Sequence, residues 1–172
     1  MIILALDLST KSSGWAVYED KKLIDYGCII AASSHLFNRI DKMIIELEKL
    51  LQKYKINHVY IEDVLPEDVH NNIQVHKALT YLQGYVLHKL DDYNLKHTFF
   101  TASEWRAKCG IQVGRGVRRD TLKPRDIKFV QDQFGIKVND DVADAIGIGF
   151  AGLGLTPEKP QIIKTDDGFE FG

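Results

Sequence analysis

The run from Ile2 to Leu8 constrains the fold of this chain more than any other feature of the sequence. It is apolar except for Asp7 near its end, and a polar turn ending at Gly14 follows it. A short, continuous apolar run bounded by turn residues is typical of a strand that is covered on both faces. The sequence therefore predicts a central strand of a layered sheet, with a carboxylate at its carboxyl end.

The rest of the chain shows strand and helix patterns in a clear order. Residues 15–19 and 22–30 alternate around a turn, which predicts an antiparallel meander with the first strand. Later segments show helical spacing of apolar residues, interleaved with short apolar runs. The expected elements are strands at 2–8, 15–19, 22–30, 58–62 and 96–100, and helices at 36–54, 71–90, 103–105, 124–134 and 140–153. The stripe of the first helix favours packing on the sheet, although it could also form a dimer seam.

This order defines the fold class. Three antiparallel strands followed by two strands reached through helices give an α/β protein with a mixed five-stranded sheet flanked by helices. That is the order of the ribonuclease-H-like fold. A chain of 172 residues accommodates one such domain, which we place at residues 1–154. Residues 155–172 contain Pro and Asp and few large apolar side chains, so we expect a loosely attached tail.

The bulk composition excludes several classes of protein. Cys28 and Cys109 form no CxxC motif, which argues against a zinc site and favours a reducing compartment. The six histidines show no metal-ligand spacing, and no apolar run approaches the roughly 20 residues of a membrane span. The amino terminus lacks the basic region of a signal peptide. We therefore expect a cytoplasmic protein with no membrane partner.

Acidic residues end two of the expected strands and begin the last helix. Asp7 and Glu62 each follow an apolar strand, and Asp141 and Asp144 share one helix face. If the first and fourth strands are neighbours, these carboxylates meet at one edge of the sheet. Taken singly, each acid is typical of a turn, a cap or the first turn of a helix. Together they predict a site for hard cations, because ligand sets made only of oxygen select Mg²⁺ or Mn²⁺. Two such ions about 4 Å apart are the arrangement that hydrolyses phosphodiesters.

The same segments resemble the RuvC-type Holliday junction resolvases, and in particular the RuvC-like endonucleases of bacteriophages. The resemblance extends from Ile2 to about Gly152. The segments that carry it are residues 3–9 with Gly14, residues 60–64, residues 82–84 and residues 141–145. It implies that Asp7, Glu62, Asp141 and Asp144 are the catalytic metal ligands. Asp140 competes for the third position, and Asp141 is preferred because the family spacing is Asp-x-x-Asp.

The resemblance also implies an activity and an assembly. A homodimer would bind a four-way DNA junction and make two symmetric nicks with Mg²⁺-activated water, leaving 5′-phosphate and 3′-hydroxyl ends. Two features depart from the family. Leu65 stands where the family has an aromatic wedge, and the segment before the last helices is longer and more basic. Lys123 or Arg125 could be the counterpart of the family's catalytic-site lysine.

Positive charge is concentrated between Trp105 and Lys128. This segment has eight basic and two acidic residues, a net charge of +6, whereas the whole chain carries −2 and the remainder therefore −8. Such clustering beside the expected metal site favours DNA contacts over a solvated loop. The predicted DNA-binding residues are Arg115, Arg118, Arg119, Lys123, Arg125 and Lys128. Trp105 could stack on a base, but packing in the core is favoured.

Three other functions fit parts of the pattern. A catalytically weak protein that only binds branched DNA would use the basic segment without turnover. Another structure-selective or RNA-directed nuclease could use the same fold and acids. The turn from Asp7 to Gly14 also resembles the first phosphate loop of actin-like and sugar-kinase phosphotransferases. Those proteins have two such domains and more than twice this length.

Overall fold

The apolar run at the amino terminus forms β1 (Ile2–Asp7), the central strand of the sheet. The computed structural model describes residues 1–65, 72–114, 119–158, 164–165 and 168–169. In it β1 pairs antiparallel with β2 (Ser12–Glu19) and parallel with β4 (His58–Glu62). Adding β3 (Lys22–Ile30) and β5 (Lys96–Phe100) gives the order β3-β2-β1-β4-β5. The predicted α/β fold with a mixed five-stranded sheet is confirmed.

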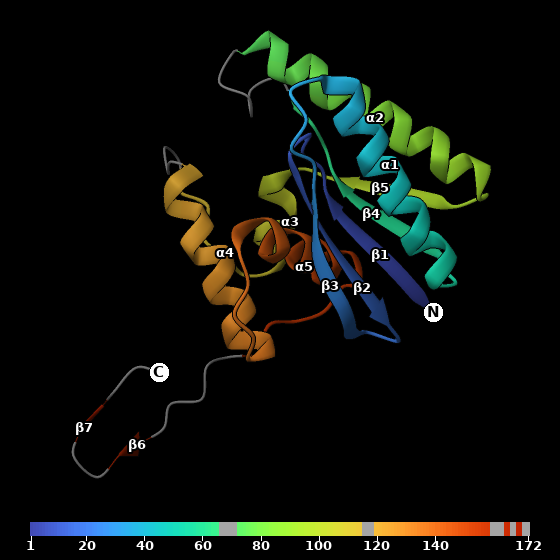
Figure 1. The fold of residues 1–172 in the computed structure, drawn as a ribbon. Helices are drawn as coiled ribbons and strands as arrows, with labels where there is room; N and C mark the ends of the chain where they lie inside the picture. The colour runs from blue at the N-terminus through green and yellow to red at the C-terminus, as the bar shows by residue number, and fades with distance from the viewer. Residues whose placement is uncertain (66–71, 115–118, 159–163, 166–167, 170–172) are drawn as a thin grey trace.

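In the described part of the chain, helices lie on both sides of this sheet (Figure 1). One face carries α1 (Leu36–Lys53) and α2 (Ile73–Asp92). On the other side α5 (Asp140–Gly152) packs along the strands, and α3 (Ala102–Lys108) and α4 (Arg119–Phe134) pack against α5. Leu4 and Leu6 of β1 pack in the core beneath α1 and α2, whereas Ile3 and Ala5 pack with α5. Because successive side chains of a strand point to opposite faces, the next residue on the α5 side is Asp7.

The last helix, α5, lies unusually close to the sheet and to α3. Two glycines permit this approach. A Cβ atom on Gly14 would lie 1.8 Å from the backbone oxygen of Asp141, and one on Gly147 would lie 2.5 Å from the ring of Trp105. The buried hydroxyl of Tyr18 donates to the backbone oxygen of Ile146 at 2.7 Å, which fixes α5 against β2. The two glycines and this hydrogen bond together hold α5 against β2 and α3.

Several helix boundaries differ from the prediction. Helix α3 begins at Ala102 and extends to Lys108, because Thr101 is its N-cap and forms a capping box with Glu104. Helix α4 begins at Arg119 rather than at Pro124, because the buried side chain of Leu122 continues its inward face towards the amino terminus.

In helices α1 and α2 some apolar side chains are buried in the core and others are exposed. The stripe of α1 packs on the sheet of its own chain, with Ile40, Met43 and Leu47 buried. In α2 the apolar residues Ile73 and Val75 are exposed, at 58% and 44%. They lie in its first turn, whereas its buried residues all come from Leu82 onwards.

The segment after α5 begins in contact with the domain. The backbone nitrogen and oxygen of Glu158 both hydrogen bond to the side chain of Gln133 on α4. Further on, β6 (Lys164–Thr165) pairs with β7 (Gly168–Phe169). The predicted boundary between a domain at residues 1–154 and a loose tail at 155–172 stays a prediction. Within the described residues, no helix has the length and apolar character needed to cross a bilayer.

Candidate functional site

Asp7 and Glu62 leave the sheet side by side. The register pairs Leu6 of β1 with Ile61 of β4, so each acid is the next residue after that pair. The two strands are parallel, so their carboxyl ends lie at the same edge of the sheet. Alternation along β4 places Glu62 on the same face as Tyr60, which contacts Gly152 of α5. The prediction that these two acids meet at one edge is confirmed, and they meet on the face that α5 covers.

Asp144 lies beneath them, in the second turn of α5. Its side chain is buried, with 6% of the residue exposed. Burial, followed by the carboxylates of Asp7 and Asp126, raises the pKa of Asp144 well above its usual range; Glu62 adds to the effect and Arg106 opposes it. Its Oδ1 atom is buried and has no hydrogen-bond partner among the described residues. Asp7, Glu62 and Asp144 therefore share one electrostatic environment.

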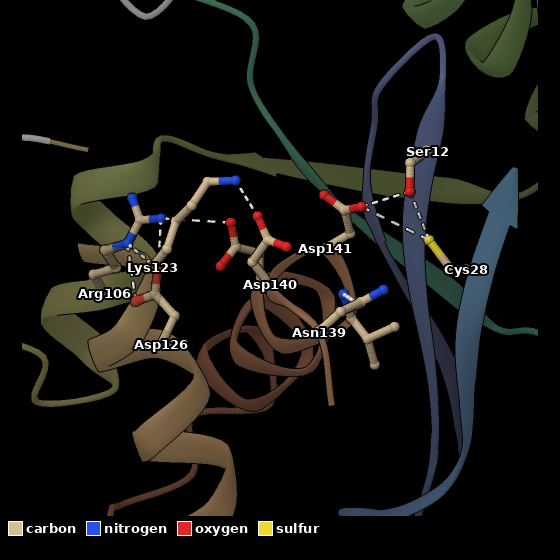
Figure 2. Close-up of polar contacts among 10 residues, drawn as sticks. Ser12, Cys28, Arg106, Lys123, Asp126, Asn139, Asp140 and Asp141 are labelled. Carbon is tan, nitrogen blue, oxygen red and sulfur yellow. Dashed lines mark hydrogen bonds and ion pairs between the residues drawn. The ribbon is translucent and has the colours of Figure 1, made fainter. Parts of the chain in front are cut away.

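Asp140 and Asp141 direct their carboxylates to opposite sides of the start of α5 (Figure 2). Asp140 forms an ion pair with Lys123, which lowers the pKa of Asp140. The Oδ2 atom of Asp141 accepts a hydrogen bond from the hydroxyl of Ser12 at 2.5 Å and lies 3.9 Å from the sulfur of Cys28. The assignment of Asp141 as the third metal ligand stays a prediction. Asp140, the alternative for this position, is paired with Lys123.

The acidic side chains, as the structure places them, do not converge on one point. Over the ranges that the structure describes, no three His, Cys, Asp or Glu side chains lie close enough together to hold an ion as they stand. Two observations nevertheless fit a cation. Asp144 presents an unpartnered buried oxygen, and its neighbours at the site are further carboxylates. Because all these donors are oxygen atoms, the residues present fit a hard divalent cation.

Two neighbouring residues of α3 belong to the site and were not predicted for it. Trp105 is fully buried, so stacking on a base is wrong and core packing is confirmed. Its indole Nε1 donates to Oε2 of Glu62 at 2.6 Å. Arg106 is also buried and pairs with the fully buried Asp126 on α4. No local spacing signals either contact, because the partners are 43 and 20 residues apart.

Arg106 is buried and so is not available to DNA, but the net charge of the remaining basic segment is unchanged. Arg106 and Asp126 cancel each other in the interior, so the other residues of the segment still carry +6. Arg125 and Lys128 are exposed on α4. Arg125 donates to the backbone oxygen of Gln112 at 2.6 Å, and Lys128 pairs with Asp132. Lys123, by contrast, lies beside the acids through its contact with Asp140.

The other predicted DNA-binding residues are less fully described. Arg115 and Arg118 lie outside the described residues. Arg119 begins α4, and nothing is described of its side chain. Their contact with DNA stays a prediction.

Comparisons with known proteins agree with this architecture. Residues 3–150 match the protein family described as crossover junction endodeoxyribonuclease RuvC. No curated protein matches the sequence at a significant level. Among solved structures, RuvC of Thermus thermophilus in complex with a Holliday junction substrate superposes with a TM-score of 0.71 at 12% identity, over 90% of this chain and 94% of that one.

Two resolvases from other sources share the fold. The fowlpox virus resolvase, solved with Holliday junction DNA, gives a TM-score of 0.55 at 14% identity over 89% of this chain and 97% of its own. The yeast mitochondrial Holliday junction resolvase gives 0.51 at 14% identity over 88% and 78%. The family match covers most of the sequence, and the fold and the paired acidic strand ends agree with it. This chain therefore belongs to the RuvC family of crossover junction endodeoxyribonucleases.

Proposed function

We propose that this chain resolves four-way DNA junctions by paired, symmetric nicks that leave 5′-phosphate and 3′-hydroxyl ends. Its membership of the RuvC family supports a structure-selective endonuclease that acts on junctions. One observation supports the chemistry most directly. Asp7 and Glu62 end neighbouring parallel strands, next to a buried Asp144 whose Oδ1 has no partner among the described residues.

The acids would act by holding Mg²⁺ or Mn²⁺, two ions per site, through Asp7, Glu62, Asp141 and Asp144. Bound divalent ions activate the attacking water and stabilise the leaving oxygen. The protein contributes rigid positions for three of these acids: two strand ends and a helix held against the sheet by Tyr18. Lys123 lies at the rim of the site beside Asp140, where its ammonium group can contact a phosphate.

The exposed basic residues of α4 supply a surface for the DNA backbone. Arg125 and Lys128 are exposed on this helix. Arg115, Arg118 and Arg119 belong to the same stretch of sequence. Such residues give affinity through phosphate contacts and release of counterions, so binding should weaken steeply with salt. Junction selectivity then depends on the shape of the DNA rather than on its base sequence.

Paired nicks require two active sites, and one domain of this size has a single acid set. We therefore propose a homodimer, formed through the exposed face of α1 and α2. Phe37 and Tyr81 stack on this face with ring centroids 6.3 Å apart, and both are about half exposed. Ile73, Val75 and Tyr85 of α2 are also exposed. Replacing Tyr81 and Tyr85 with Glu should give a folded monomer in light scattering that no longer makes coordinated nicks.

The decisive experiment is cleavage of a synthetic four-way junction beside a matched duplex, a flap and a three-way junction, with Mg²⁺ or Mn²⁺. We expect paired nicks in the four-way junction and much less cleavage of the duplex. Asp7→Asn, Glu62→Gln and Asp144→Asn should abolish cleavage but still shift the junction on a gel. Cleavage retained in one of these variants would remove that residue from the site.

The basic segment alone would support a second candidate function. The chain would then bind branched DNA without cutting it. The same assay decides between the two. A wild-type protein that shifts the junction but leaves it intact with both metals would be a binding protein.

The proposed place of action is the cytoplasm, or the host cytoplasm if a bacteriophage encodes the chain. The thiols of Cys28 and Cys109 are both free, which suits a reducing compartment.

A further inference from the structure

Two consecutive residues of α3 each reach one of the candidate metal ligands. Trp105 donates its indole N–H to Oε2 of Glu62 at 2.6 Å. The Nη2 atom of Arg106 lies 3.6 Å from Oδ2 of Asp144. The guanidinium carbon also lies 4.4 Å from the centroid of the Trp105 ring, so the two side chains stack on each other. A single short helix thus contacts an acid from the sheet and an acid from α5.

Asp126 of α4 holds Arg106 in this position. The Nε atom of Arg106 donates to both carboxylate oxygens of Asp126, at 3.1 and 3.0 Å, and its Nη2 donates to Oδ2 at 2.9 Å. A bidentate pair of this kind fixes the plane of the guanidinium group. Arg106 is 6% exposed and Asp126 is fully buried, so water does not compete for these bonds.

The arrangement gives the two oxygens of Asp144 different surroundings. Oδ2 faces the guanidinium group of Arg106, whereas Oδ1 is buried without a hydrogen-bond partner in the described part of the chain. Rotating the carboxylate out of its present plane would weaken the contact between its oxygen and the guanidinium group of Arg106. Arg106 therefore favours one orientation of the carboxylate plane, in which one oxygen faces the guanidinium group and the other has no hydrogen-bond partner among the described residues.

We propose that Trp105, Arg106 and Asp126 are positioning residues that orient Glu62 and Asp144 for a divalent cation. This inference rests on the proposed function, because it assumes that these two acids bind metal. Groups that hydrogen bond to metal ligands and fix their orientation typically change metal affinity by roughly 10- to 100-fold when they are removed. The three residues act through the acids and are not themselves in contact with a reacting group.

A purely structural role is the alternative, and isosteric variants separate the two. Trp105 also fills the core against Gly147. Trp105→Phe keeps most of that packing but loses the N–H donor. Arg106→Lys keeps the charge but loses the bidentate geometry. The matched controls are Trp15→Phe, at the other tryptophan of the chain, and Arg39→Lys on α1, whose guanidinium donates to the backbone oxygen of Ser33.

The test is the affinity of the full chain for Mn²⁺, measured by calorimetry without DNA, with folding checked by the urea midpoint. We expect Trp105→Phe and Arg106→Lys each to weaken Mn²⁺ binding by roughly tenfold, while Trp15→Phe and Arg39→Lys bind as wild type does. Arg106→Gln adds a second criterion. If Arg106 were only a nearby charge, its removal would tighten Mn²⁺ binding, whereas loss of positioning weakens it.

A spectroscopic readout supports the same test. In the Trp15→Phe variant, Trp105 is the one tryptophan left, so its fluorescence should change when Mn²⁺ binds Glu62. Wild-type Mn²⁺ affinity in Trp105→Phe and Arg106→Lys would overturn the positioning role while leaving the proposed nuclease function intact. A wild-type chain that binds no Mn²⁺ and cuts no junction would overturn both proposals.

Discussion

The variant Arg106→Gln tests how much the buried ion pair between Arg106 and Asp126 contributes to stability. Arg106 and Asp126 are 6% and 0% exposed, and three hydrogen bonds join them. Removing one partner of a buried pair leaves an uncompensated charge, which typically costs about 3–5 kcal/mol. Here the cost should lie towards the upper end, because Arg106 also faces Asp144. For a chain of this length we expect a fall in the melting temperature of roughly 6–20 °C.

The double variant Arg106→Gln with Asp126→Asn shows whether charge causes the loss. Two amides can hydrogen bond to each other without a buried charge, so much of the lost stability should return. Urea unfolding in metal-free buffer at pH 7 gives the free energies of unfolding for both variants. The reasoning is wrong if Arg106→Gln loses less than about 1 kcal/mol, or if the double variant is no more stable than the single one.

The pH dependence of the free energy of unfolding gives a further test of this reasoning. Burial raises the pKa of Asp144 and Arg106 opposes that rise, so removing Arg106 should raise the pKa of this buried carboxyl further above its unfolded-state value. A raised carboxyl pKa lowers stability above the unfolded pKa, and the penalty vanishes as pH falls below it. The stability gap between wild type and Arg106→Gln should therefore narrow between pH 7 and about pH 4. A gap that stays constant would assign the loss to packing instead.

Three further predictions concern the site and the DNA surface. Because burial raises the pKa of Asp144, ionised Asp144 lowers stability above the usual aspartate pKa. Asp144→Asn should therefore raise the melting temperature of the metal-free chain at pH 7 and remove the stabilisation by Mn²⁺ in a thermal-shift assay. Gly147→Ala would place a methyl group 2.5 Å from the Trp105 ring and should cost about 1–3 kcal/mol in urea unfolding. Neutralising Arg125 and Lys128 should reduce the slope of log affinity against log salt concentration by the amount expected for about two phosphate contacts. An unchanged slope would place both residues away from the DNA.

Patterns along the chain were sufficient to predict the sheet and its acids. A strand buried on both faces requires a nearly continuous apolar run, so β1 was visible as a central strand, and period-two alternation identified its neighbours. Parallel pairing of β1 with β4 then placed Asp7 and Glu62 together. These features depend on local periodicity and on chain order, both of which a single sequence displays.

Tertiary structure alone decided which charged residues are buried and which side chains they contact. Arg106 belongs by sequence to a basic segment for DNA, yet it is buried between α3, α4 and α5 because Asp126 and Asp144 surround it. Likewise Asp140 and Asp141 are adjacent in sequence, but one pairs with Lys123 and the other with Ser12. Contacts between residues 17 to 129 positions apart leave no periodic signal. The sequence by itself therefore determined the architecture and the pairing of the two strand-end acids, and the packing of α5 against β2 and α3 decided which side chains contact these acids.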